Sequence, residues 1–457
     1  MGKHYKKNMC RKGRKKRMIS NEKKGRASAL LPILVFLLLY VGSGIYYQYI
    51  RGEDQGFYIM SVVVAFTAAL TVALLQNREL DFNEKLKVMA EGVGDDNIIA
   101  MILIFLFAGA FSGMAAAAGG SSGTAYLLLD ILPANQLLVG FFIIACVISM
   151  AMGTSCGTIS VLVPIAAAAA EAAGMNLAVM LGAIIGGAMF GDNMSFISDT
   201  TIAATRTQGC DMKDKFRENF AIALPAAVVT IVILLFRGGS GAPVENPDYN
   251  ILQALPYFIV FALALAGLNV LVVLGSGILL FTVVGFITID GFTFSDVFGS
   301  TGEGTSGMFE TIIVAVLVSA LGALIKKYGG FDYILYVIRR YFRGKNGGQL
   351  GIAVLSSAMD IATANNTVAI VMAAPIAKEI SSEYKISPKK TASLMDIFCC
   401  IWQGIIPYGA QMLIALGLAA EYKLSAFDVI PNIHYVFLLL ICALVSIFLP
   451  ERMRKKS

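Results

Sequence analysis

The chain has 457 residues, of which 57% are hydrophobic and only 14% are charged. A soluble domain needs charged groups over its surface, so this composition excludes an ordinary soluble globular protein. Apolar stretches of about 18 residues or more recur along the chain, and each is long enough to cross a hydrocarbon core of about 30 Å. We therefore predict an all-α polytopic membrane protein, whose first partner is the lipid bilayer.

The net charge of +6 is concentrated at the two ends of the chain. Lys and Arg are dense before Ala29, and residues 451–456 are also mostly basic. Basic flanks stay on the cytoplasmic side, which predicts a bacterial plasma (inner) membrane protein with both termini in the cytoplasm. We interpret residues 1–28 as a topology-setting tail, with Met18 as an alternative start, and not as a patch that binds nucleic acid. The apolar run from Ala29 is too long for a signal peptide and lacks a small-residue cleavage site.

Cysteine and histidine patterns argue against a metal centre. The seven cysteines show no Cys-x-x-Cys spacing, and the two histidines, His4 and His434, are far apart in the sequence. Zinc sites need ligands at short, characteristic spacings, so we expect no cofactor besides the transported ions.

Two series of apolar segments follow one another in the same order, the second at an offset near 211 residues. The first series is Ala29–Ile50, Gly56–Leu75, Ile98–Ala118, Leu137–Ala173 (interrupted), Leu177–Phe190 and Phe220–Phe236. The second is Ile251–Ala266, Val270–Ile289, Phe309–Ile325, Leu350–Ile380 (interrupted), Ser393–Ile406 and Ile430–Leu449. The predicted parts are a tail (1–28), a first transmembrane repeat (29–236), a linker (237–250), a second repeat (251–449) and a C-terminal tail (450–457).

Loop charges indicate that the two repeats are inverted. Residues 115–135 hold no Lys or Arg, whereas their counterparts 326–346 hold six. The other pairs reverse in the same way: three in 77–96 against none in 288–307, none in 170–179 against three in 381–390, and four in 205–217 against one in 416–428. Because basic loops stay in the cytoplasm, this alternation is what inverted-topology repeats would produce. The predicted cytoplasmic loops are Gln76–Asp96, Thr205–Arg217, Lys326–Asn346 and Ser381–Lys390.

Both repeats contain a polar interruption inside an apolar segment, at Gly153–Thr158 and at Asp360–Thr367. Unwound backbone at membrane depth persists only where it lines a cavity or is buried in protein, and helix ends that meet there can hold an ion. The alternative is a flexible kink packed against small residues. The candidate oxygen ligands from these two interruptions are Thr154, Ser155, Thr158, Asn365, Asn366 and Thr367.

The most specific polar motif is Gly191–Thr201, which carries two carboxylates, Asp192 and Asp199, after a short apolar segment. A charged Asp at the centre of a membrane helix costs about 2.5–3.5 kcal/mol, so two of them call for a compensating cation. The alternative is a cytoplasmic loop that caps the next helix. The other candidate ligands of this motif are Asn193, Ser195, Ser198 and Thr200.

The second repeat adds two intramembrane acids, Asp360 and Asp396, and each is a functional candidate. Gln403 occupies the position that matches Asp192 at the offset of 211. The two repeats are therefore not chemically equivalent.

Two motifs resemble those of a known family. Gly153-Thr154-Ser155-Cys156-Gly157-Thr158 resembles the Gly-Thr-Ser-x-Gly-Thr element of NhaC-type Na⁺/H⁺ antiporters, which belong to the ion transporter superfamily. Gly191–Thr201 is similar to that family's Gly-Asp-x-x-Ser-Pro-x-Ser-Asp-Thr-Thr element. Phe196 stands where proline is usual, and Cys156 replaces a commonly aromatic residue. The resemblance implies exchange of Na⁺ for H⁺, although similar proteins exchange organic acids such as malate and lactate or carry amino acids.

The predicted mechanism uses one carboxylate that holds either ion. Burial favours the protonated form of a carboxyl group and a bound cation favours the ionised form, so Na⁺ and H⁺ compete. We assign this role to Asp199, with Asp192 beside it as a second Na⁺ ligand. A Na⁺-coupled carrier of amino or organic acids is the alternative transporter. An intramembrane hydrolase fits less well, because no paired catalytic-helix signature is present. A homodimer is compatible with the sequence.

Overall fold

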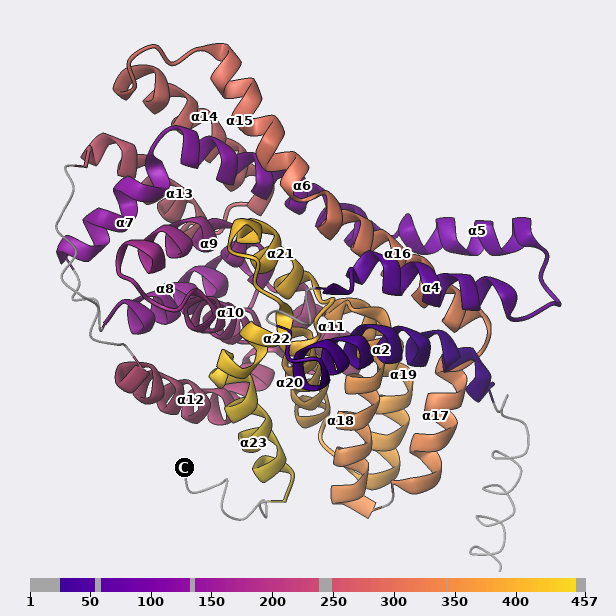
Figure 1. Ribbon diagram of the computed structural model, residues 1–457. Coiled ribbons are helices and arrows are strands. Elements are labelled where there is room, and N and C mark those ends of the chain that lie inside the picture. Colours follow the sequence, from indigo (N-terminus) through magenta and orange to yellow (C-terminus); the bar gives the residue numbers. More distant parts are fainter. Residues whose placement is uncertain (1–24, 54–58, 132–135, 238–248, 343, 449–457) are drawn as a thin grey trace, which may run out of the picture.

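The computed structural model describes residues 25–53, 59–131, 136–237, 249–342 and 344–448. Within these ranges the chain is helical and contains no β-strand, as Figure 1 shows. Eight of the described helices are long and apolar enough to cross a membrane, or nine if the bent pair Ala426–Asn432 and His434–Phe448 is one span. The prediction of an all-α polytopic membrane protein is confirmed.

The helices fall into two series. The first series is α2 (Leu31–Ile45), α4 (Val62–Leu75), α5 (Phe82–Val93), α6 (Asp96–Ala117), α7 (Gly120–Ile131), α8 (Leu137–Met152), α9 (Ser155–Ala172), α10 (Leu177–Met194), α11 (Asp199–Gln208) and α12 (Met212–Arg237). The second is α13 (Ile251–Leu265), α14 (Val270–Thr288), α15 (Phe294–Gly307), α16 (Phe309–Lys327), α17 (Gly330–Tyr341), α18 (Gly344–Thr363), α19 (Asn366–Tyr384), α20 (Pro388–Ile405), α21 (Ala410–Leu418), α22 (Ala426–Val429) and α23 (His434–Phe448).

Helix boundaries in the second series follow those in the first at the predicted offset. The 18-residue helices α10 and α20 begin at Leu177 and Pro388, which are 211 positions apart. The starts of α9 and α19, and those of α11 and α21, are separated by the same 211 positions. Around the two breaks, corresponding helices of the two series therefore begin at positions that match to the residue. The opposite orientation of the two halves stays a prediction.

The apolar pattern missed seven helices. Three of them, α11, α21 and α22, have only 4 to 10 residues. The other four, α5, α7, α15 and α17, have 12 to 14 residues each. They carry more polar residues than the predicted segments, so no long apolar run marks them. The pattern also placed the start of α12 too late. This helix begins at Met212, eight positions before the predicted start at Phe220. The basic stretch before Phe220 therefore lies partly in a helix.

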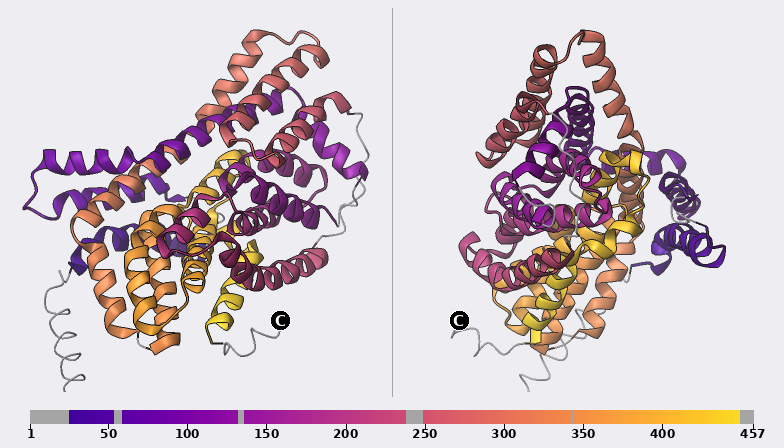
Figure 2. Two further views of the ribbon diagram at one scale, coloured as in Figure 1. Left: turned by 180° about the vertical axis from the view of Figure 1, so that it is seen from behind. Right: turned by 60° about the vertical axis from the view of Figure 1, so that its left-hand side comes forward.

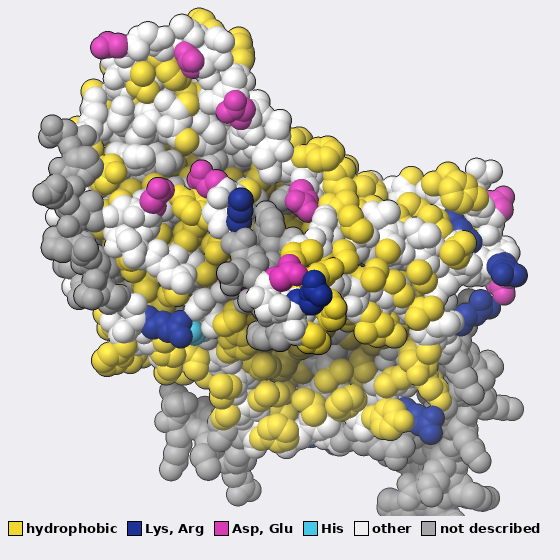
Figure 3. Space-filling view, in the orientation of Figure 1, with side chains coloured by type: hydrophobic (Ala, Val, Ile, Leu, Met, Phe, Trp, Pro, Cys, Tyr) yellow, Lys and Arg dark blue, Asp and Glu magenta, His cyan; other side chains and the backbone are white. Residues whose placement is uncertain are grey.

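The centre of the molecule is formed by α9, α10 and α20. In the spans that contain α10 and α20, 94% and 83% of the apolar window is buried, against 28% for the span with α2 and 33% for α14. In Figures 1 and 2 the hairpin of α14 and α15 lies at one end and the group α17, α18 and α19 at the other, with α20 between them. Apolar side chains cover broad areas of the face in Figure 3, as expected of a surface in contact with lipid.

Close packing of α10 on α8 fixes the position of the central helices. A Cβ atom added at Gly187 would lie 2.4 Å from the Phe142 carbonyl oxygen, and one at Gly191 would lie 2.4 Å from the Cys146 carbonyl oxygen. Small residues four positions apart let two membrane helices approach backbone to backbone. The position of the last turn of α10, which carries Asp192, is therefore set by backbone contact with α8.

Both halves break at matching residues. Gly153 ends α8 with a φ of 71°, and Thr154 then caps α9 by accepting a hydrogen bond from the Gly157 amide. In the second half, Ala364 has a φ of 49°, and Asn365 caps α19 by accepting a hydrogen bond from the Val368 amide. Each break is two residues long, shorter than the sequence predicted.

Candidate cation-binding site

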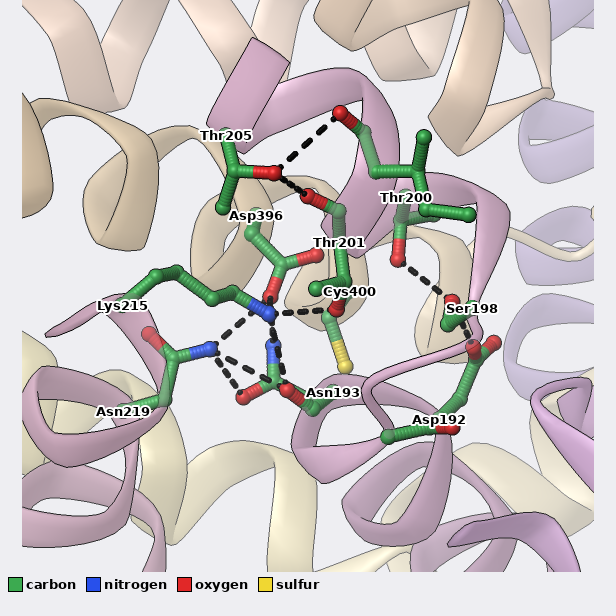
Figure 4. A network of polar contacts seen from close by, with 12 residues as sticks. Asp192, Asn193, Ser198, Thr200, Thr201, Thr205, Lys215, Asn219, Asp396 and Cys400 are labelled. Atoms are coloured by element: carbon green, nitrogen blue, oxygen red, sulfur yellow. Dashed lines mark hydrogen bonds and ion pairs between the residues drawn. The ribbon is translucent and has the colours of Figure 1, made fainter. Parts of the chain in front are cut away.

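Asp192 lies in the last turn of α10, where it meets the first residue of α9. Its side chain is buried, at 7% exposure. One carboxylate oxygen accepts hydrogen bonds from the Ser155 hydroxyl at 2.7 Å and the Ser155 amide at 3.3 Å. The other accepts a hydrogen bond from the Ser198 hydroxyl at 2.5 Å, and Figure 4 shows this contact. The amino end of α9 thus holds this carboxylate, as helix amino ends commonly hold anions.

A cavity of about 140 Å³ adjoins Asp192. A cavity of about 150 Å³ accommodates benzene, so this space suits a cation with its waters or a small organic ion. The helices α9, α11, α19 and α21 all direct their amino ends to it. The lining residues from these ends and breaks are Gly153, Thr154, Ser155, Cys156, Ser198, Asp199, Thr200, Ala364, Asn365, Asn366, Thr367, Ala410 and Gln411.

The charge balance of the cavity depends on its two carboxylates. Each helix amino end carries a partial positive charge of about half an elementary charge. Among the described lining residues, only Asp192 and Asp199 are charged. A cation in the cavity therefore needs one of these carboxylates, because the helix ends alone favour an anion.

Asp199 and Asp192 have different surroundings. Asp199 is the first residue of α11 and its side chain is exposed, whereas Asp192 is enclosed by Ser155 and Ser198. Ser198 precedes α11 but makes no side-chain capping bond, since its hydroxyl contacts Asp192 and Thr200. From the sequence we expected Asp199 to be the buried carboxylate, whereas in the structure Asp192 is buried and Asp199 is exposed.

A chain of hydrogen bonds leads from Asp192 to the break in the other half. Gln411 donates to the Ser155 hydroxyl oxygen at 2.9 Å. Gln403 in turn donates to the Gln411 side-chain oxygen at 2.9 Å and to the Ala364 carbonyl oxygen at 3.2 Å. The side chains of Ser155, Gln403 and Gln411 are all buried, and the bond from Gln411 to Ser155 is the step of this chain that joins the two halves.

A separate polar cluster lies behind the cavity and contains a buried ion pair. Lys215 of α12 and Asp396 of α20 are each 1% exposed, and their charged atoms are 2.6 Å apart. Lys215 also donates to the Thr201 hydroxyl at 2.7 Å, and Asn193 and Asn219 donate to Asp396 at 2.8 and 2.9 Å. Figure 4 shows Lys215 between Asp396 and Thr201, with Asp192 on the other side of Asn193. This cluster connects α10, α11 and α12 of the first half with α20 of the second.

Lys215 belongs to the predicted cytoplasmic loop Thr205–Arg217, but in the structure it lies in α12 and its side chain is buried. The side of the membrane that this segment faces stays a prediction. Arg206, Lys213 and Arg217 are close to Lys215 in the sequence, so composition alone does not distinguish the lysine whose side chain is buried. Asp396 was predicted as a cation-binding candidate, but its charge is already balanced by Lys215. A signal was present in the sequence, because an intramembrane Asp needs a counter-charge and Lys215 is a basic residue near the start of a long apolar segment.

The third buried acid, Asp360, is in the last turn of α18 and is 0% exposed. Among the described residues, no donor contacts either of its carboxylate oxygens. It does not line the cavity beside Asp192.

The predicted ligands divide into two groups. The cavity is lined by Asp192, Asp199, Ser198, Thr200, Thr154, Ser155, Asn365, Asn366 and Thr367. Outside its lining are Asn193, Ser195, Thr158, Asp360 and Asp396. Ser195 and Thr158 donate instead to the carbonyl oxygens of Met150 and Thr154, so their hydroxyls serve the backbone. Gln411, the amide nearest to Ser155, was missed because a glutamine in an apolar helix gives no strong signal.

Metal-binding side chains do not gather elsewhere in the described part of the chain. Within it, no three His, Cys, Asp or Glu side chains lie close enough to hold a metal ion. Its six described cysteines are free thiols.

A family model described as the Na⁺/H⁺ antiporter family matches residues 9–238 and 250–449. The Na⁺/H⁺ antiporter NhaC of Bacillus subtilis (strain 168) is 26% identical over 422 residues, which cover 83% of this chain and 90% of that protein. The malate-2H⁺/Na⁺-lactate antiporter of the same organism is 21% identical over 418 residues, covering 84% of this chain and 89% of that protein. Among solved structures, the YdaH transporter of Alcanivorax borkumensis aligns with a TM-score of 0.42 and 14% identity, over 92% of this chain and 98% of that chain.

Proposed function

Because this chain belongs to the Na⁺/H⁺ antiporter family, we propose that it exports Na⁺ in exchange for protons that move inward. It is a multi-pass membrane protein and a Na⁺/H⁺ antiporter or a related transporter. The finer proposal places it in the bacterial plasma membrane with both termini in the cytoplasm, in agreement with the basic residues at its ends. The predicted homodimer stays a prediction.

The observation that carries this proposal is the buried carboxylate of Asp192 beside a polar cavity. In its ionised form this group supplies a negative oxygen for Na⁺, and the hydroxyl oxygens of Ser155, Ser198 and Thr200 lie around it. Hard cations prefer oxygen ligands of this kind. We therefore transfer to Asp192 the role that the sequence suggested for Asp199.

Exchange follows from competition for this carboxylate. Burial favours its protonated form, and a bound Na⁺ favours the ionised form, so each ion displaces the other. Two conditions then couple the flux of Na⁺ to the flux of protons. Asp192 must be accessible from one side of the membrane at a time, and the protein must not change its access while Asp192 is ionised and has no ion bound. At the cavity, Gln411 of the second half donates to Ser155 of the first half, and Gln403 holds Gln411 in place, which suits a movement of one half against the other.

The direct test is transport by the purified protein in proteoliposomes that contain a pH-sensitive dye. An inward Na⁺ gradient should make the interior more alkaline, and K⁺ at the same concentration and membrane potential serves as the control. No change of internal pH with Na⁺, in vesicles where the protein is inserted and folded, would contradict the proposal.

A second candidate function is Na⁺-coupled transport of a small organic acid. The observation that favours it is the arrangement of four helix amino ends around a cavity of about 140 Å³, because such ends bind carboxylates. In the same vesicles, this function predicts little Na⁺-driven pH change until malate, lactate or an amino acid is added. A Na⁺ response that these compounds leave unchanged would rule it out.

A further inference from the structure

Among the described residues, three acidic side chains are almost fully buried, Asp192, Asp360 and Asp396, and they differ in their partners. Asp192 accepts hydrogen bonds from two serine residues, and Asp396 contacts Lys215 and two asparagines. Asp360 is 0% exposed, and none of the described residues donates a hydrogen bond to either of its side-chain oxygens. Asp360 is thus the buried acid whose charge nothing in the described chain balances.

The lack of a partner determines which form of Asp360 this arrangement favours. An ionised carboxylate without a counter-charge or hydrogen-bond donor is far more costly to bury than a neutral carboxylic acid. The last turn of a helix adds a partial negative charge, which opposes a second one there. Asp360 therefore carries a proton in this arrangement of the helices.

The described side chains around Asp360 offer no charge or hydrogen-bond donor that would stabilise its ionised form in place of the proton. The buried thiols of Cys399 and Cys400 on α20 and the phenol of Tyr408 lie near enough to respond to a charge on Asp360. Cys399 donates to the Ser356 carbonyl oxygen and Tyr408 to the Ile361 carbonyl oxygen, so both protons are in use. The described charged side chains on the packed helices α16, α17 and α19 are exposed: Glu310, Lys326, Lys327, Asp332, Arg340, Lys378, Glu379 and Glu383. On α20, Asp396 pairs with Lys215, Lys389 pairs with Glu218, and the buried Lys390 donates to Ser446. The fifth packed helix, α23, carries the half-buried His434.

Asp360 is connected to the cavity through the break in the second half. The Ala364 amide donates to the Asp360 carbonyl oxygen at 2.7 Å, and the Ala364 carbonyl oxygen accepts a hydrogen bond from Gln403. Gln403 contacts Gln411, whose side chain reaches Ser155 and so Asp192. A change at Asp192 can therefore move the turn that carries Asp360.

We propose that Asp360 is a second proton-carrying carboxyl group, separate from the cation site, and that every exchange cycle moves its proton as well as the one displaced from Asp192. This inference rests on the proposed Na⁺/H⁺ exchange. When Na⁺ binds at Asp192, the break rearranges and the O–H bond of Asp360 opens, which leaves a carboxylate and passes the proton to water. After Na⁺ leaves on the other side, a proton from that side restores the carboxylic acid.

The test is the ratio of protons to Na⁺, measured in proteoliposomes as the pH gradient at which a fixed Na⁺ gradient drives no net flux. The wild type should exchange more than one proton per Na⁺, and Asp360→Asn should exchange one proton fewer. Asp360→Glu keeps the carboxyl group and should restore the wild-type ratio. Ser149→Ala is the matched control, because Ser149 lies 211 positions before Asp360, and its ratio should equal that of the wild type.

Each outcome decides the question. A wild-type ratio of one proton per Na⁺, or an equal ratio in wild type and Asp360→Asn, overturns the role of Asp360 but leaves Na⁺/H⁺ exchange intact. Absence of any Na⁺-driven proton flux in the wild type contradicts the proposed function itself. If Asp360→Asn transports nothing, the protons released when Na⁺ binds to the solubilised protein are counted by calorimetry in two buffers. Equal release from variant and wild type then overturns the proposal, and one proton fewer supports it.

Discussion

The two halves of the molecule share helix boundaries but place their acids differently. Asp192 lies in the last turn of α10 beside the cavity, and Gln403, 211 positions later, occupies the matching place near the end of α20. Asp360 has Ser149 as its counterpart, and the Ser149 hydroxyl donates to the Ala188 carbonyl oxygen at 2.6 Å. The first half thus has its buried acid at the cavity, whereas the second half encloses Asp360 between helices and pairs Asp396 with Lys215.

This difference leads us to expect one cation site and not two. The amide of Gln403 cannot neutralise a cation, and it instead contacts the backbone of its own half and Gln411. If matching helix boundaries were enough for ion binding, each half would have its own cation site. We propose that the carboxylate of Asp192 in the first half binds the cation and that the amides of the second half position this carboxylate.

The largest effect is expected from exchanging the acid for an amide in the first half. Asp192→Asn keeps the shape and some hydrogen bonding but cannot hold a proton or balance Na⁺, so Na⁺-driven proton flux should fall to the background of empty vesicles. Gln403→Leu, at the matching position, removes no charge and should retain measurable flux. An equal loss of proton flux in Asp192→Asn and Gln403→Leu would contradict the claim that only the first half supplies the cation-binding group.

The next largest effect concerns the ion pair that connects the halves. Lys215→Met leaves Asp396 buried without its counter-charge, which should lower the free energy of unfolding by about 3–5 kcal/mol. The double variant Lys215→Met with Asp396→Leu removes both charges and should recover much of this loss. Thermal unfolding of the detergent-solubilised protein measures both. A double variant less stable than Lys215→Met would show that the pair does not act as a unit.

A smaller effect should follow from shortening the chain of amides at the cavity. Gln411→Leu removes the donor to Ser155 and leaves Gln403 without one acceptor. A buried polar group left unpaired costs about 1–3 kcal/mol, so the Na⁺ concentration for half-maximal exchange should rise by about tenfold. Transport measured over a range of Na⁺ concentrations provides the value. An unchanged Na⁺ concentration for half-maximal exchange would show that Gln411 does not contribute to the cation site.

The smallest predicted effects compare the two breaks. Gly153 and Ala364 are 211 positions apart and both have left-handed backbone, with φ of 71° and 49°. Left-handed backbone costs a residue with a Cβ atom about 1–2 kcal/mol. Ala364→Gly should therefore stabilise the protein by up to about 1 kcal/mol, because the added freedom of the unfolded chain offsets part of the gain. The unfolding temperature provides the measurement.

Gly153→Ala is the reciprocal variant and should destabilise the protein. Its new Cβ atom would lie 2.7 Å from a side-chain carbon of Ile197, in addition to the backbone cost. Changes of the same sign in Gly153→Ala and Ala364→Gly would show that the breaks are not structurally equivalent.

The sequence predicted the features that depend on local composition. Long apolar runs located α6, α10 and α14, and the clusters of Gly, Thr and Asn located the two breaks. These signals are local because membrane helices need apolar residues over their whole length, and breaks need residues that accept left-handed backbone or cap a helix. The offset of 211 residues between the two series could be predicted because it, too, is defined by the positions of apolar runs and breaks.

The choice among the acids was not predictable from local composition. Asp192 and Asp199 belong to one motif, but Asp192 is buried in the last turn of α10 against Ser155 and Ser198, whereas Asp199 starts α11 and is exposed. Lys215 is close to Asp396 only because α12 packs on α20, a contact between residues that are 181 positions apart. Such contacts depend on how the two halves fit together, which one sequence without its fold does not reveal.

The central claim is that Asp192 carries the cation, and direct Na⁺ binding tests it most simply. Na⁺ would be titrated into the purified, detergent-solubilised protein in a calorimeter, for the wild type, Asp192→Asn and Asp199→Asn. The account predicts that Asp192→Asn, although folded, binds no Na⁺, while the exposed Asp199 contributes only a few-fold to affinity through its field. Binding by Asp192→Asn with wild-type affinity, together with its loss in Asp199→Asn, would contradict the account.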